Sequence, residues 1–315
     1  MADSSQHELW YIEEVTRGTT PDAPAWKRVR DISCTLGLTK NSVISEESRG
    51  DRQIRRMDYT TQSLDGDIGT YLFYGDNDDL LEAGLCGSWA VDTPTIGTDQ
   101  LKTGTTRRSF SFMRVFQDLG AGAKKYQINT GVEVNSVAVA VAVTVDAYIT
   151  LTFSMVGSDL TLNTAAPAGS TYVEPIINKE PMVVTTADIK EGGSTIGTIT
   201  EFSPSLENGM ETRFAIGSAL TRRPTLGNST ATGSITTYFE DTVLYEKFLN
   251  QTGSSMEITA ADATGNRIRI VQPNIVYTGT RPDTASSGDV LLTMPYQALY
   301  DATNETNMYV ERNPT

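Results

Sequence analysis

Residues 132–155 constrain the fold more than any other part of the sequence, because their apolar side chains alternate along most of the segment. Valine occupies every odd position from 137 to 145, and alanine occupies the even positions from 138 to 142. Successive side chains of a strand point to opposite faces, so this pattern predicts a strand that is buried on both faces. The alternation resumes from Ile149 to Met155 against threonine and serine, which predicts a second strand and a hairpin turning near Asp146.

Threonine supplies 44 of the 315 residues, and with valine, isoleucine and tyrosine it fills the segments between glycine, asparagine, aspartate and proline clusters. β-Branched side chains pack well on a pleated surface, so this composition favours strands. Short helices are predicted at 79–85 and 240–250. The acidic run at 76–79 lacks the glycine and distal glutamate of an EF-hand loop, and we interpret it as a cap of the first helix.

The two predicted helices follow similar segments. GDIGTYL at 66–72 and GSITTYF at 233–239 share four of seven residues. Three further pairs of segments occur in the same order: 33–36 with 203–206, 109–113 with 255–259, and 126–137 with 267–278. Ordered matches predict a tandem duplication of one antiparallel β-sandwich or barrel unit with one helix in each copy. We expect a first unit at 1–162 with an N-terminal arm, a linker at 163–170 and a second unit at 171–315.

Charge and composition exclude several classes of function. The chain has one histidine, His7, and two cysteines, Cys34 and Cys86, which are too few for a histidine-based catalytic triad or a zinc cluster. We therefore expect no enzyme, no metal and no cofactor. The net charge of -14 argues against wrapping nucleic acid, because affinity for phosphate comes mainly from lysine and arginine. Without an apolar leader or membrane span, we expect a soluble protein made in the cytosol, with no membrane partner.

Several segments in a fixed order carry a family resemblance. They are YIEEV at 11–15, GTTP at 18–21, SRGDRQ at 48–53, GDI at 66–68, RSFSF at 108–112, FQD at 116–118, GVEVNS at 131–136 and YFED at 238–241, together with Trp26 and the first predicted helix. This pattern resembles the tail tube proteins of long-tailed bacteriophages with non-contractile, siphovirus-type tails. It covers nearly the full chain.

The resemblance implies a structural virion protein whose β-sandwich subunits form rings. The rings would stack into a hollow tail tube through which viral DNA leaves the capsid. The implied partners are further copies of the chain, the tape measure protein, and the terminator and tip proteins of the tail, with double-stranded DNA passing without specific binding. The protein would be made in the host cytoplasm and would reside in the virion tail. If the chain holds two copies of the fold, three chains close a ring of pseudo-sixfold symmetry, and six chains remain the alternative.

Arginine is concentrated in one polar segment, at Arg49, Arg52, Arg55 and Arg56. We predict that residues 45–60 form a projecting loop, and that its guanidinium groups pair with carboxylates of the adjacent ring. An exposed loop without a partner is an equally good interpretation, because isolated surface charges contribute little.

Strand alternation assigns a channel face, because the inner wall of such tubes is a barrel built from neighbouring sheets. The strands that match this wall are 29–38 and 63–71, with second copies near 199–206 and 232–238. We expect the apolar residues Ile32, Cys34, Leu36, Leu38, Leu64, Ile68, Leu72, Phe202 and Leu206 to face the core. The lumen-facing carboxylates are then Asp65, Asp67, Glu201 and Asp31, which would repel DNA. Ordinary solvated strand positions are the alternative interpretation.

A second function is also compatible with the sequence. The chain could instead be a β-sandwich receptor- or glycan-binding module of a phage tail tip. An enzyme is the weakest interpretation, because acid–base groups would have to be carboxylate pairs alone.

Overall fold

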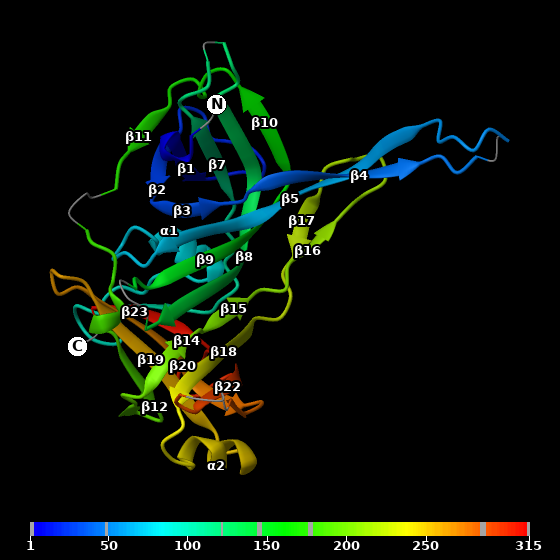
Figure 1. Ribbon diagram of the computed structural model, residues 1–315. Helices are drawn as coiled ribbons and strands as arrows, with labels where there is room; N and C mark the ends of the chain where they lie inside the picture. Colours follow the sequence, from blue (N-terminus) through cyan, green and yellow to red (C-terminus); the bar gives the residue numbers. More distant parts are fainter. Residues whose placement is uncertain are drawn as a thin grey trace.

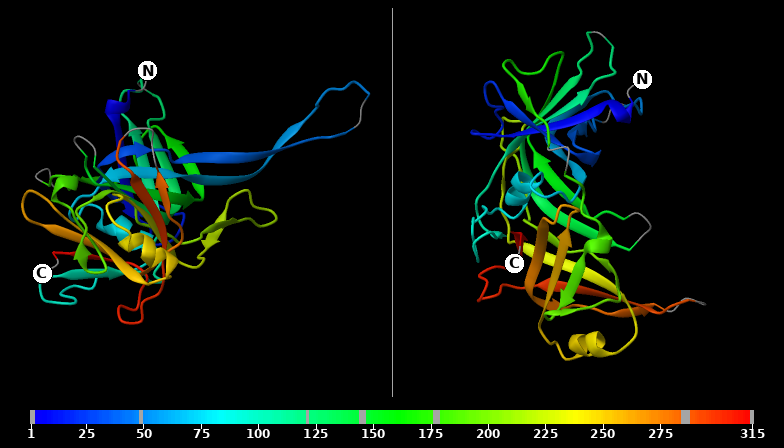
Figure 2. Two further views of the ribbon diagram at one scale, coloured as in Figure 1. Left: turned by 60° about the horizontal axis from the view of Figure 1, so that its bottom comes forward. Right: turned by 90° about the vertical axis from the view of Figure 1, so that its left-hand side faces the viewer.

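The computed structural model is mainly β, as the sequence predicts, and the ribbon is elongated with the two halves of the chain at its two ends (Figures 1 and 2). The structure describes residues 3–47, 50–120, 122–143, 147–175, 179–283 and 288–313. Nearly all strand pairs in this part of the chain are antiparallel; the pair of β11 with β2 is parallel.

The first half of the chain lies at the top of Figure 1. It contains a 3₁₀ turn at Ser4–Gln6, then β1 (His7–Glu13), β2 (Ala25–Val29), β3 (Asp31–Cys34), β4 (Gly37–Ile44), β5 (Met57–Tyr71), α1 (Asp78–Gly84), β6 (Asp99–Lys102), β7 (Phe110–Phe116), β8 (Tyr126–Ala142), β9 (Thr150–Gly157), β10 (Asp159–Asn163) and β11 (Thr171–Val173).

The second half lies below it. It contains a 3₁₀ turn at Val184–Thr186, then β12 (Asp188–Glu191), β13 (Ser194–Thr195), β14 (Ile199–Phe202), β15 (Ser205–Glu207), β16 (Glu211–Arg213), β17 (Arg222–Thr225), β18 (Thr230–Tyr238), α2 (Val243–Leu249), β19 (Ser254–Ala261), β20 (Arg267–Tyr277), β21 (Arg281–Asp283), β22 (Leu291–Ala298) and β23 (Tyr309–Arg312). Both short helices are therefore where the sequence predicts them, to within three residues.

One sheet runs through both halves, and we call it the continuous sheet. Its strands stand side by side in the order β3/β4, β5, β9, β8, β14/β15, β18, β22 and β21. Where two strands share a position, they pair with successive segments of the same neighbouring strand. The halves are joined at the pairing of β8 with β14 and β15.

The long strand β8 links the continuous sheet to the other layer of the first half. Its first residues pair with β7 and β10, and its later residues pair with β9, β14 and β15. The layer beyond β7 continues through β1 and β2 to β11. The predicted β8–β9 hairpin is confirmed by this pairing, whereas the turn near Asp146 lies outside the described residues.

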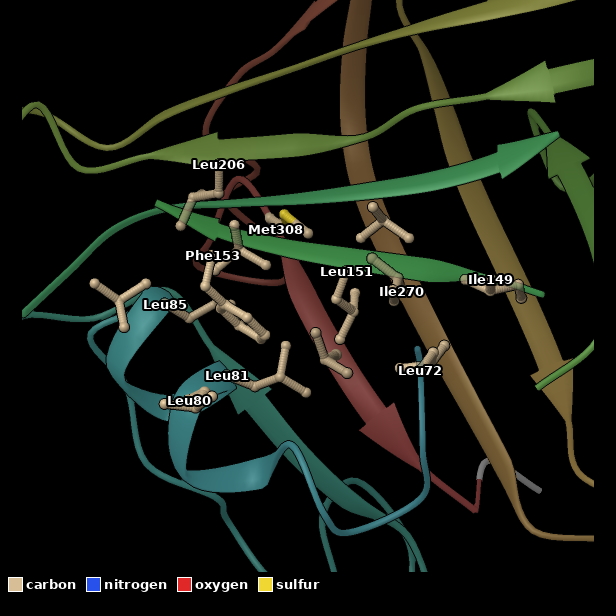
Figure 3. Packing of buried hydrophobic residues seen from close by; sticks show 14 of the residues in the cluster. Leu72, Leu80, Leu81, Leu85, Ile149, Leu151, Phe153, Leu206, Ile270 and Met308 are labelled. Carbon is tan, nitrogen blue, oxygen red and sulfur yellow. The ribbon is translucent and has the colours of Figure 1, made fainter. Parts of the chain in front are cut away.

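The core lies between these layers and around α1. In Figure 3, Leu80, Leu81 and Leu85 of the helix region lie beside Phe153 of β9, and Ile270 and Met308 come from the second half. Gly84 sits so close to β8 that a Cβ there would be 2.0 Å from Cγ2 of Val137. Only glycine fits this approach without displacing the valine.

Three local predictions are wrong. The predicted strand at 29–38 is divided into the end of β2, β3 and the start of β4. The predicted loop at 45–60 is shorter, because residues 57–60 already pair in β5. Strand β8 is not buried on both faces: Val137, Val139 and Val141 are buried but Ala140 is exposed, because no other element of the described part of the chain covers the alanine side.

The predicted cap of α1 also does not form. Asn77 occupies the N-cap position without a side-chain hydrogen bond to the helix. The neighbouring carboxylates instead bind cations: Asp76 contacts Arg30 and Lys179, and Asp79 contacts Lys27. These distant partners stabilise the acidic run in place of the local cap.

Candidate assembly surfaces

The continuous sheet has one face that no element of the described chain covers, and we call it the open face. Residues opposite one another on antiparallel neighbours point to the same side of a sheet. One line of such pairs runs from Gly69 through Thr152, Ala138, Ser205 and Thr232 to Gln297. Small and hydroxylated side chains therefore follow one another across both halves, while the opposite face carries the apolar core.

Asp65 and Asp67 lie on β5 in the first half of the open face. Both are exposed, while Leu64 and Ile68 on either side of them are buried, as the alternation predicts. Ser154 Oγ donates a hydrogen bond to Asp67 Oδ1 at 2.6 Å. The backbone of Asp67 also bonds to Thr35, whose N–H donates to the Asp67 carbonyl at 2.9 Å. The Asp67 carboxylate is thus held at a fixed place on the face.

Glu201 lies on β14 in the second half of the same face. It is exposed, and Thr236 Oγ1 donates to its Oε2 at 3.4 Å. The sequence prediction omitted Glu207, the last residue of β15, which is exposed and pairs with Ser136 and Thr230. Ser136 pairs in turn with Ser154, the neighbour of Asp67. Polar residues alternate along the sequence at positions 201, 203, 205 and 207, and this alternation would have identified Glu207.

Asp31 lies apart from the other predicted carboxylates. The pairing of β3 with β5 shifts between Asp31 and Ser33, so Asp31 is opposite Thr70 and Ser33 is opposite Gly69. This irregularity changes the side to which Asp31 points. Its Oδ2 is 3.5 Å from Nδ1 of His7 on β1, and its side chain is half-buried. A bulge of this kind depends on the partner strand and cannot be read from the alternation of one segment.

A hairpin of β4 and β5 projects far from the body, and we call it the arm (Figures 1 and 2). Its tip, residues 50–56, is exposed. Arg52, Arg55 and Arg56 lie there, and Arg56 Nε is 2.7 Å from Oδ2 of Asp58. Arg49 lies outside the described residues. The structure thus places the three described arginines at the end of a projecting hairpin, away from the body of the chain.

A second, shorter hairpin of β16 and β17 lies beside the base of the arm (Figure 1). The N–H of Gln62 on β5 donates to the carbonyl of Ala219 at 2.9 Å. Arg223 of β17 binds Glu133 of β8, with 2.9 Å between Nε and Oε1. Glu133 is 1% exposed and also binds Arg17 and Arg107. The second half thereby supplies one of three guanidinium groups around a buried carboxylate of the first half.

No group of three or more histidine, cysteine, aspartate or glutamate side chains among the described residues could hold a metal ion. No helix in that part of the chain is long and apolar enough to cross a membrane.

The fold and these surfaces define a structural β-protein built for assembly, with an uncovered sheet face and a projecting arm. Comparison with family models identifies the family: the model of the phage tail tube proteins matches residues 4–298, so the chain belongs to this family. None of the curated proteins searched gives a significant match. The protein is therefore a structural component of the phage tail tube, located in the virion tail, that assembles with itself and associates with other tail proteins.

Proposed function

We propose that three copies of this chain close each ring of a non-contractile tail tube, with pseudo-sixfold symmetry from an internal duplication. The carrying observation is a repeated order of strand pairing. In the first half β4 pairs with β5, then β9, β8, β7 and β1 follow as successive neighbours. In the second half the order is β15, β18, β22, β20, β19 and β12.

Matched details support the duplication. Each helix follows the second strand of the pairing order in its half, α1 after β5 and α2 after β18. The Thr35 N–H donates to the Asp67 carbonyl at 2.9 Å, and the Ser203 N–H donates to the Ser234 carbonyl at 3.0 Å. Three of the four pairs of segments that match in the sequence fall on strands in equivalent places. The fourth pair, 33–36 with 203–206, is out of register by two residues, because the strand pairing makes Cys34 equivalent to Phe202. Because β11 pairs with β2, we place the passage between the units after Val173 rather than at 163–170.

The number of strand positions supports closure of the sheets of neighbouring chains into one ring. The continuous sheet has eight positions, and all neighbouring pairs are antiparallel. An even number lets the alternation of strand direction continue from one chain into the next. Native mass spectrometry of solubilised rings, with negative-stain microscopy of the intact particles, tests the proposal. We expect three chains in each ring, and six chains would contradict it.

In this ring we propose that the open face lines the channel. DNA carries one negative charge per roughly 1.7 Å of duplex axis, so a wall rich in lysine and arginine would retain it. Asp65, Asp67 and Glu201 would repel the phosphates, and we add Glu207. Phage carrying Asp65→Lys, Asp67→Lys and Glu201→Lys should eject DNA more slowly with normal tubes.

The matched control for this experiment changes the same amount of charge elsewhere. Asp22, Glu211 and Asp289 are exposed and lie off the open face. Their replacement by lysine should leave ejection unchanged. Equal ejection kinetics in the two triple variants would contradict the lumen assignment, whatever the ring stoichiometry.

We further propose that the arm joins successive rings, with Arg49 and the three described arginines binding carboxylates of the adjacent ring. Replacing Arg52, Arg55 and Arg56 by glutamate should stop tube growth and leave the chain folded. Replacing the same three by lysine keeps the charge and should weaken stacking only in part. Tubes of normal length from the glutamate variant would contradict this role. The tape measure, terminator and tip proteins are the further partners that we propose, with synthesis in the host cytoplasm.

A further inference from the structure

The continuous sheet ends in two edges that have no partner strand within the described chain. At one end β3 and β4 pair with β5 alone, and at the other end β21 pairs with β22 alone. We propose that β3 and β4 of one copy pair with the edge of β21 of the next, in the register of the junction inside the chain. This inference rests on the proposed ring and specifies the residues that close it.

The junction inside the chain provides the template. There β15 pairs with β8 through Ser205 opposite Ala138, Leu206 opposite Val137 and Glu207 opposite Ser136. The Val139 N–H donates to the carbonyl of Pro204, between β14 and β15, at 2.9 Å. The second half thus joins the first by adding an antiparallel strand to the outer edge of β8.

Equivalent residues follow from the pairing of β5 and β18. Ile68 is opposite Cys34, and Ile235 is opposite Phe202, so β3 and β4 correspond to β14 and β15. At the other end of the sheet, Thr70 is opposite Leu151, which is in turn opposite Val139. In the second half, Thr237 is opposite Leu292, which is in turn opposite Pro282.

These correspondences give the register between copies. Gly37, Leu38 and Thr39 of one copy lie opposite Arg281, Thr280 and Gly279 of the next. Strand direction alternates across the eight positions. Strand β4 of one copy would therefore run antiparallel to β21 of the next, as β15 runs antiparallel to β8.

Proline replaces the residue that donates across the template junction. Pro282 stands where Val139 stands in β8, and proline has no backbone N–H to donate. The acceptor equivalent to Pro204 is the carbonyl of Leu36, which already accepts a hydrogen bond from Arg114 Nη1 at 2.9 Å. One donor is missing at one edge and one acceptor is satisfied at the other. The two edges therefore fit each other without leaving a polar group unpaired.

Burial of the equivalent side chains agrees with a missing partner. Phe202 is 2% exposed and Leu206 is fully buried at the junction inside the chain. At the free edge Cys34 and Leu38 are half-buried, and Ile32, which the sequence assigns to the core, is 50% exposed. Val139 is buried but Pro282 is exposed. A strand from the next copy would cover these residues.

Disulfide trapping tests the register. In a Cys34→Ser, Cys86→Ala background, Thr39→Cys protein is mixed with Gly279→Cys protein, assembled and oxidised. Directly opposite Cβ atoms lie about 4.5–5.5 Å apart, whereas diagonal ones lie about 7–8 Å apart, so this pair should form covalent dimers. The control pair, Gly37→Cys with Gly279→Cys, is shifted by two residues and should give less than a tenth of that product.

A second measurement concerns the proline. Arg114→Met leaves the Leu36 carbonyl without its donor at the junction and should weaken association between chains about tenfold. Adding Pro282→Val supplies an N–H and should restore association in the double variant. A merely structural role of Arg114 would show no such rescue, and absence of rescue would overturn this part of the inference.

The outcomes separate this inference from the proposed function. Rings that form normally but cross-link only in the shifted pair would overturn the register and leave the tube function intact. Chains that remain monomeric at high concentration would contradict both.

Discussion

The two helices occupy equivalent places in the pairing order but have different surroundings. Four residues of α1 are buried: Leu80, Leu81, Ala83 and Gly84. In α2 only Leu244 is buried, and Val243 and Leu249 are 55% and 60% exposed. The second half of the chain covers α1, and nothing in the described chain does the same for α2. We infer that the two helices differ in burial because the neighbouring unit of α1 belongs to the same chain, whereas the neighbouring unit of α2 would belong to the next copy.

Residues of the second half contact α1 at both of its ends. Asn208 Nδ2 donates to the Gly84 carbonyl at 2.8 Å, at the C-terminal end of the helix. Arg312 of β23 binds Asp78 and, at 2.7 Å, Asp99, and its guanidinium lies over the ring of Trp89. In α2, the ion pair of Lys247 is with Glu191 of the same half. The first helix is thus part of the contact between halves.

The largest expected difference comes from truncating one leucine in each helix. Leu81→Ala removes a buried side chain and should lower the free energy of unfolding by about 2–5 kcal/mol. Leu249→Ala removes an exposed one and should change it by no more than about 0.5 kcal/mol in the isolated chain. Urea denaturation of both variants measures the difference. Similar losses in the two variants would contradict the contrast between the helices.

A smaller loss is expected when α1 is disconnected from the second half. Arg312→Met keeps much of the apolar stem but removes the charge that binds Asp78 and Asp99. Hydrogen bonds to charged groups contribute about 1.5–3 kcal/mol, so we expect a loss of that size. Burial raises the pKa of the Asp78 carboxyl, and the Arg312 charge partly offsets that rise. Urea denaturation checks the loss, and Arg267→Met, at an exposed position of β20, is the control that should be neutral.

Alkaline pH should distinguish the halves through their tyrosines. Burial raises the pKa of Tyr277 and Tyr296 in the second half above the ordinary value of 10.0, as it does for Tyr11 in the first. The folded state keeps these protons longer than the unfolded state. Their stabilisation is therefore complete below pH 10 and decreases as pH rises above it, by about 1.4 kcal/mol per pH unit for each tyrosine.

Two spectroscopic signals measure this effect. All three tryptophans, Trp10, Trp26 and Trp89, belong to the first half, so their fluorescence reports on that half, whereas far-ultraviolet circular dichroism reports on both. Between pH 10 and 11 we expect the circular dichroism signal to be lost at lower urea concentration than the fluorescence signal. Tyr296→Phe removes one ionising group and should make the dependence on pH shallower. Coincident curves at every pH would show that the halves unfold together.

The smallest effect concerns association rather than folding. If the next copy covers α2, Leu249→Ala should weaken ring formation a few-fold, because a partly exposed leucine buries little additional surface. Sedimentation measures the association constant. Glu305→Ala, at an exposed position away from α2, is the control and should leave association unchanged. Unchanged association in Leu249→Ala would place the contact elsewhere.

Features with a local cause could be predicted from the sequence. The β8–β9 hairpin, both helices and the outward placement of Asp65, Asp67 and Glu201 follow from alternation or short apolar patterns. These patterns act within one strand or helix, where a period of two or 3.6 residues decides which side chains can be buried. The same rule extended by one step would have included Glu207.

Tertiary structure alone decided the features that depend on a distant partner. The bulge that turns Asp31 toward His7 arises from the register of β3 on β5, and the exposure of Ala140 arises because none of the described elements covers the open face. Glu133 collects Arg17, Arg107 and Arg223 from segments far apart in the sequence. Which faces of the strands are apolar follows from the amino-acid sequence. Which of those faces and edges remain uncovered was decided by packing, because burial depends on what lies opposite a residue and not on the residue alone.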